Sequence, residues 1–114
     1  MNVNLKLREE ECSLFGTIEG EIDTYTAPIL REELEAIHIK ENLLVVLDLS
    51  KVTYIDSTGL GVFIAFYKKV MKENGKLKLV RLSSRLLRLF EITGLSKLMD
   101  IETDEKVELT NERI

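Results

Sequence analysis

The stretch that decides the fold runs from Leu43 to Asn74 and opens with the apolar run Leu43-Leu44-Val45-Val46-Leu47, followed by Asp48. A short polar link carrying Val52 and Tyr54 follows, and then Ile55-Asp56-Ser57-Thr58-Gly59-Leu60-Gly61 leads into a long apolar helix. A fully apolar strand that leads into a helix is half of an α/β unit with a buried parallel strand. Ser57 is therefore predicted to lie at the strand-to-helix turn, where open α/β sheets usually carry their chemistry.

The length and composition predict one globular domain over residues 1–114, with a hydrophobic core of its own. No stretch approaches the roughly 18 apolar residues that span a membrane, and the alternating segment 1–6 lacks the apolar core of a signal peptide. The single cysteine, Cys12, cannot form an internal disulfide, and one histidine forms no metal-binding cluster. We expect a soluble cytoplasmic protein without a cofactor or a structural metal.

Charge is distributed unevenly along the chain, whose net charge is −4. Residues 1–50 carry four basic and eleven acidic side chains, whereas residues 68–97 carry nine basic and two acidic ones. The basic segment either supplies solvated faces of successive elements or forms a patch that steers an acidic partner. Nucleic acid is not an expected partner, because the chain is acidic overall and its basic residues are not interleaved with aromatic ones.

The hydrophobic periodicity predicts the order β-β-α-β-α-β-α-β-α, with the first two strands forming an antiparallel hairpin. Helix starts are marked by Pro28, and by Ser83 or Ser84, and Gly94 marks a helix end. The strands are expected at 3–8, 12–20, 43–48, 76–81 and 100–102, and the helices from 28 to before 41, at 57–73, at 85–92 and after 103–105, with a short helical turn at 95–99.

The chemistry that suits the turn at Ser57 is phosphorylation. A helix amino terminus has unpaired N–H groups and a partial positive charge, so a phosphate there is stabilised locally. The effect of the phosphate would therefore fall on a protein that docks at this turn. The alternative is that Ser57, or Asp56 beside it, only caps the helix.

The helix at 57–73 carries two apolar stripes. Phe63, Phe66 and Val70 form the first, and the second consists of Leu60, Ile64, Tyr67 and Met71. Covering a sheet requires a single apolar face, so the second stripe packs on neighbouring helices or forms a groove for a partner. Gly59 and Gly61 each cost helix stability, of order 1 kcal/mol relative to alanine, which implies close backbone approach by the sheet or by something outside.

Several segments resemble the signatures of the STAS domain family. They are Gly20-Glu21-Ile22-Asp23, Ala27-Pro28, Asp56-Ser57-Thr58-Gly59-Leu60-Gly61 and Arg88-Leu89-Phe90-Glu91-Ile92-Thr93-Gly94-Leu95. The resemblance is to the bacterial anti-sigma factor antagonists RsbV and SpoIIAA, and more closely to the RsbV branch. It extends from about residue 2 to about residue 110, and the segment 56–61 is its most specific part.

The resemblance implies a partner-switching regulator of the stress response and of transcription. The unphosphorylated form would bind an anti-sigma factor that is also a serine kinase, and so release the sigma factor. Phosphorylation of Ser57 would end that binding, and a metal-dependent serine phosphatase would restore it. Asp23, Asp56, Thr58, Gly59 and Leu60 would shape the recognition surface around Ser57. The implied fold is α/β, a small mixed sheet of four or five strands with helices mainly on one face.

Two other functions compete with the phosphorylation switch. A serine hydrolase would use Ser57 with His38 and an aspartate, but no Gly-x-Ser-x-Gly elbow surrounds Ser57, and His38 is expected at the surface. No nucleotide-binding glycine motif occurs either, so no enzyme activity and no catalytic residue are predicted. The stronger rival is a STAS scaffold or accessory module whose binding does not depend on phosphorylation, because the fold alone does not settle the function.

Overall fold

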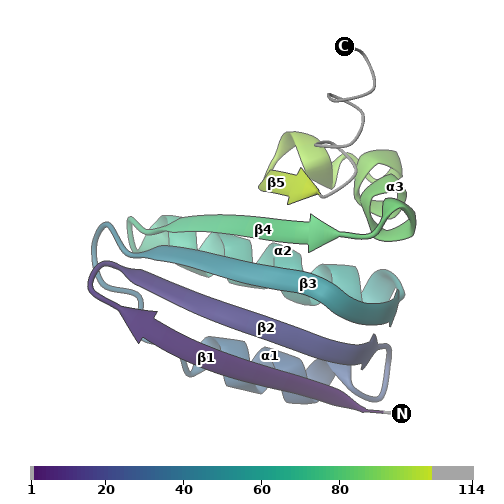
Figure 1. Ribbon diagram of the computed structural model, residues 1–114, viewed down its shortest axis with the longest axis horizontal. Helices are drawn as coiled ribbons and strands as arrows, with labels where there is room; N and C mark the ends of the chain where they lie inside the picture. The colour runs from purple at the N-terminus through teal and green to yellow at the C-terminus, as the bar shows by residue number, and fades with distance from the viewer. Residues whose placement is uncertain (1, 104–114) are drawn as a thin grey trace.

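The apolar segment from Leu44 to Leu47 lies in the central strand of a five-stranded sheet in the computed structural model, which describes residues 2–103 (Figure 1). The spatial order β1-β2-β3-β4-β5 follows the chain order, with β1 and β2 antiparallel and all other neighbours parallel. The predicted hairpin and mixed sheet are therefore confirmed. The elements are β1 (Val3–Glu10), β2 (Ser13–Ile22), α1 (Ala27–Glu35), β3 (Leu44–Ile55), α2 (Ser57–Lys72), β4 (Lys76–Leu82), α3 (Ser84–Ile92), the 3₁₀ turn η1 (Leu95–Lys97) and β5 (Asp100–Thr103).

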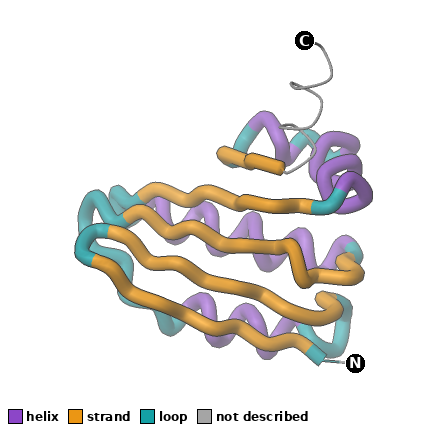
Figure 2. Tube along the Cα trace, in the orientation of Figure 1, coloured by secondary structure: helices purple, strands orange, loops and turns teal. Residues whose placement is uncertain are grey.

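The core lies between the sheet and the helices α1 and α2, which run behind the strands in Figure 2. Alternate residues of the strands, among them Ile18, Leu47 and Leu79, are fully buried on that face. From the helix side Phe63 is fully buried as well, and its ring and that of Phe90 pack at an interplanar angle of 60° with a centroid distance of 6.2 Å. Two of the helices predicted from periodicity, α1 and α2, thus cover one face of the sheet, as expected for the α/β fold class.

One prediction about the central strand is wrong, because the segment 49–54 is part of β3 and not a polar link. The pairing of β3 with β2 shifts register twice, and each shift leaves one extra residue in β3. Such bulges break the alternation of buried and exposed side chains, so Val52 and Ile55 are buried at a spacing of three. The predicted last helix after 103–105 lies outside the described residues, and the single domain over 1–114 stays a prediction.

The second apolar stripe of α2 serves the core more than a partner. Leu60 is buried, Ile64 and Tyr67 are partly buried against the core, and only Met71 is well exposed. The stripe therefore contributes mainly to internal packing.

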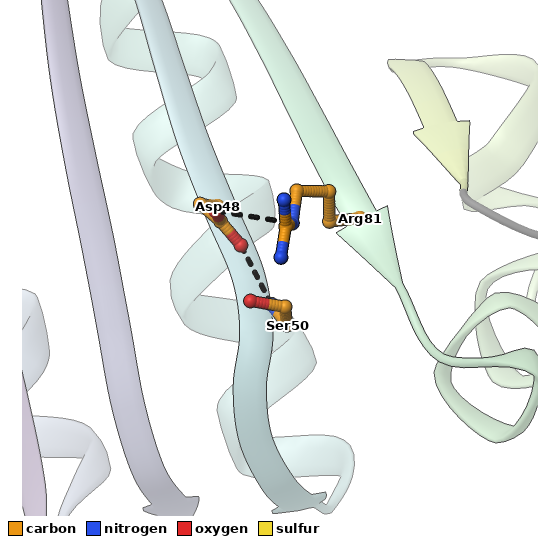
Figure 3. A network of polar contacts seen from close by, with 3 residues as sticks. All are labelled: Asp48, Ser50 and Arg81. Atoms are coloured by element: carbon orange, nitrogen blue, oxygen red, sulfur yellow. Dashed lines mark hydrogen bonds and ion pairs between the residues drawn. The ribbon is translucent and has the colours of Figure 1, made fainter.

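The face of the sheet opposite the helices carries charged side chains above a few apolar ones. Arg81 lies in the left-handed region, with φ of 61°, where the register between β4 and β5 shifts. Its Nε lies 3.4 Å from Asp48 Oδ2, while Asp48 Oδ1 accepts a 2.8 Å hydrogen bond from the Ser50 N–H (Figure 3). Lys78 pairs with Glu102 on the same face. These cations of the basic segment therefore have partners within the protein.

The end of α1 is held by a lysine from α2. The ammonium group of Lys69 donates hydrogen bonds of 2.6 Å to the carbonyl oxygens of both Glu35 and Ile37. The last carbonyls of a helix lack partners within the helix and carry its negative dipole end. Lys69 therefore supplies a positive charge at the end of α1, whose own last turn has no basic residue, and links α1 to α2.

Replacing Lys69 by methionine is expected to lower the free energy of unfolding by about 1–3 kcal/mol, because the carbonyls lose a charged donor. The matched control is Lys68→Met, at an exposed neighbouring position, which should change stability little. Urea unfolding followed by circular dichroism measures both. Equal stability of the two variants would contradict the assigned role of Lys69.

Candidate functional site

Three helices begin at one edge of the sheet, where the carboxyl ends of β2, β3 and β4 lie side by side (Figure 1). The connection from β2 enters α1, the one from β3 enters α2, and the one from β4 enters α3. We call this the acceptor edge, because it contains Ser57, the predicted phosphate acceptor, at the start of α2. Parallel strands display their connecting loops together at such an edge.

Asp56, not Ser57, caps α2. Its backbone is extended, and its Oδ1 accepts a 3.0 Å hydrogen bond from the Gly59 N–H. Ser57 is the first helical residue, and both it and Thr58 are exposed. Within residues 2–103 we find no hydrogen bond made by the Ser57 hydroxyl. The fold thus leaves this hydroxyl available to a partner.

Gly59 and Leu60 form the layer beneath the exposed serine. A Cβ atom on Gly59 would lie 2.7 Å from the side chains of Ile22 and Ile55, and 2.9 Å from the Ile22 carbonyl oxygen. The same Ile22 carbonyl accepts a 3.1 Å hydrogen bond from the Asp56 N–H. Because Leu60 is only 5% exposed, it supports the turn from below and presents no side-chain surface to solvent.

Asp23 is also buried, with 7% of its surface exposed. Its carboxylate accepts hydrogen bonds from the Tyr25 N–H at 2.9 Å and the Thr26 N–H at 3.0 Å. The Thr26 hydroxyl accepts one from the Asp23 N–H and donates one to the Glu21 carbonyl. The Thr26 N–H above all, with that of Tyr25, holds the pKa of Asp23 below its usual range, although burial opposes this shift. Asp23 therefore orders the loop between β2 and α1.

Exposed apolar side chains at the acceptor edge escaped the sequence analysis. Tyr25 is 81% exposed in the loop before α1, and Ile29 is exposed in the first turn of that helix. The sequence could have indicated their exposure, because Tyr25 and Ile29 do not share the helical spacing of Leu30 and Leu34, which face the core. Large exposed apolar residues that gather in one place mark interaction surfaces.

A second apolar area lies where β3 meets α3. Tyr54 and Ile92, the latter 74% exposed, line a groove of about 340 Å³, to which the exposed Arg85 and Arg88 also contribute. No local pattern marks this groove, because its two sides come from separate segments. Tyr54 lies near the carboxyl end of β3, three residues before Ser57, so the groove adjoins the acceptor edge.

The family model described as "STAS domain" matches residues 4–109. The chain belongs to the STAS domain family. It is 43% identical over 106 residues to the "Anti-sigma-B factor antagonist" of Listeria monocytogenes, covering 92% of this chain and 93% of the relative. The protein of that name from Bacillus subtilis is 46% identical over 101 residues, covering 89% and 92%.

Solved structures agree with this assignment. The crystal structure of an anti-sigma factor antagonist from Mycobacterium paratuberculosis superposes with a TM-score of 0.79 at 28% identity, covering 99% of this chain and 96% of that one. The resemblance to the RsbV and SpoIIAA antagonists is therefore confirmed, and so is the STAS fold. Within residues 2–103, no helix has the length and apolar character that crossing a bilayer requires.

The arrangement does not fit a serine hydrolase. His38, the single histidine of the chain, lies with Leu43 in a hollow near the start of β3, whereas Ser57 follows the end of that strand. A general base must lie within hydrogen-bond reach of the hydroxyl that it activates. The exposed Ser57 hydroxyl therefore lies away from the single histidine of the chain.

The hydrogen bonds of Asp23 predict a dependence of stability on pH. Because its folded pKa lies below the unfolded value of 3.8, the stabilisation is present above that value and is lost as the pH falls through the folded pKa. Asp23→Asn is therefore expected to be less stable than the parent at pH 7, and the difference should shrink below about pH 4. Urea midpoints at pH 7 and pH 3 test this, with Asp100→Asn, at an exposed position, as the control. A difference that is the same at both pH values would contradict it.

Proposed function

We propose that this chain is an anti-sigma factor antagonist that is switched by phosphorylation of Ser57. The observation that carries the proposal is the exposed hydroxyl of Ser57, which the fold does not use, at the amino terminus of α2. The names of the relatives at 43% and 46% identity support the antagonist role. This function places the protein in the cytoplasm, where bacterial transcription takes place.

In the proposed cycle, the unphosphorylated chain binds an anti-sigma factor that is also a serine kinase, and the sigma factor is released. The kinase then transfers the γ-phosphoryl group of ATP to Ser57 Oγ, whose proton is lost, and the complex dissociates. A metal-dependent serine phosphatase hydrolyses the phosphoserine and restores the binding form. The chain itself supplies the acceptor and the docking surface, and carries no catalytic residue.

The charge of one phosphate is sufficient for such a switch. It adds about −1.5 to −2 charges at pH 7, and enclosing it against a partner without basic groups costs on the order of several kcal/mol. About 4 kcal/mol corresponds to a thousandfold loss of affinity. At the same time the N–H groups at the start of α2 stabilise the phosphate locally, so α2 is expected to stay folded.

The site residues divide into two roles in this proposal. Ser57 and Thr58, both exposed, contact the partner directly. Asp56 caps α2, Gly59 and Leu60 seat its first turn on the sheet, and Asp23 orders the loop that carries Tyr25. The second group shapes the recognition surface by positioning the first, and the groove of Tyr54 and Ile92 extends that surface toward α3.

Two substitutions of Ser57 test the switch. Ser57→Ala should abolish phosphorylation and leave the affinity for the kinase within about tenfold, a loss of at most roughly 1.4 kcal/mol. Ser57→Asp should weaken binding, because it places a charge where the phosphate would lie. Intact-mass spectrometry with the kinase-type anti-sigma factor of the same organism, ATP and magnesium measures the first effect, and calorimetric titration measures the second.

Titration of the phosphorylated and unphosphorylated chains separates the switch from the alternative of a STAS scaffold. A scaffold would bind its partner equally in both forms. A single phosphate on Ser57, with tight binding only before its addition, is the expected result. Unchanged affinity after phosphorylation would contradict the switch, and the family assignment would be unaffected.

The groove beside α3 gives a further prediction for the same complex. Ile92→Ser should leave the Tm nearly unchanged, because the side chain is mostly exposed, and should weaken kinase binding by roughly tenfold, as expected for loss of an apolar interface contact. Met71→Ser, at an exposed apolar position near the far end of α2, is the control. Equal affinity of the two variants would exclude the groove from the interface.

A further inference from the structure

Gly61 is a glycine that the fold does not require. It lies inside α2, and a Cβ atom added to it would meet nothing within 4 Å. Glycine in a helix interior is less stable than alanine, because it loses more conformational freedom on folding. The contrast is Gly59, where the neighbouring strands exclude any side chain. The close approach that explains Gly59 is therefore absent at Gly61 among the described residues.

The position of Gly61 relates it to the acceptor serine. Residues four apart in a helix lie one above the other on the same face, so Gly61 lies directly below Ser57, one turn along α2. The position is partly open to solvent, and Thr58 beside it is exposed. A protein that transfers a phosphoryl group to Ser57 Oγ has to cover this face of the helix.

We propose that Gly61 is a contact point at which the kinase-type anti-sigma factor packs directly on the bare backbone of α2. The inference rests on the proposed function, and it adds a residue that determines whether the kinase can dock closely on α2. A side chain at position 61 would separate the two proteins and draw the kinase active site away from Ser57 Oγ. Gly61 thus favours binding of the kinase, although it lowers the stability of α2.

Stability and binding are expected to respond to the same substitution in opposite directions. Gly61→Ala should raise the Tm by about 4 °C, since alanine favours the helix and fits the open space. Binding of the unphosphorylated chain should weaken by about tenfold for Gly61→Ala and by about a hundredfold for Gly61→Leu, because a filled contact tolerates added volume poorly.

The experiment titrates the kinase-type anti-sigma factor of the same organism with the parent chain, Gly61→Ala, Gly61→Leu and Ala36→Leu, with ADP in place of ATP. Ala36 is exposed at the end of α1 remote from the acceptor edge, so its substitution controls for added apolar bulk. Circular dichroism gives the Tm of each variant, and single-turnover phosphorylation with ATP gives the rate of transfer.

A graded loss of affinity with side-chain size, with the Tm maintained or raised and Ala36→Leu unaffected, is the expected result. Parent-like affinity of Gly61→Leu would overturn the inference. A slower phosphoryl transfer at unchanged affinity would also overturn it, since the glycine would then act through flexibility of the helix start. Failure of the parent chain itself to bind or to be phosphorylated would instead contradict the proposed function.

Discussion

The seating of the first turn of α2 on the ends of β2 and β3 is the constraint on which the acceptor edge depends. The missing side chain of Gly59 brings the helix backbone against Ile22 and Ile55, and the Asp56 N–H bonds to the Ile22 carbonyl. These contacts fix where α2 starts, and thereby which residue is its cap and which is exposed. The direction in which Ser57 points is thus a consequence of backbone packing two residues away.

The order of elements through β5 could be predicted from the sequence, because each strand and helix has a clear hydrophobic period. The end of the first helix was predicted wrongly, since α1 ends at Glu35 and not just before Glu41. The extent of β3 could not be predicted. Its second half pairs with β2 through two bulges, and a bulge replaces the two-residue alternation by spacings that resemble a loop. The irregularity arises from the pairing of β3 with β2, which is distant in sequence, so no pattern within residues 49–55 indicates it.

The candidate site was predictable to a similar degree. The strand-to-helix turn places Ser57 at an edge, but both aspartate and serine are good caps, and only the geometry assigns that role to Asp56. Asp23 has its carboxylate turned into its own loop, which depends on the turn made by Thr26. The apolar groove of Tyr54 and Ile92 requires α3 to lie against the end of β3, a tertiary relation that local periodicity does not contain.

The unused hydroxyl of Ser57 has a consequence for the timing of a response. Because no described residue bonds to it, attaching a phosphate removes no internal interaction, and both forms of the protein are expected to persist equally long in the cell. In the proposed switch, the phosphorylated form would then constitute a ready reserve. If Ser57 is switched as proposed, a bacterium under sudden stress would draw on that reserve by hydrolysis alone, without new protein synthesis, and the delay before transcription changes would be set by phosphatase activity.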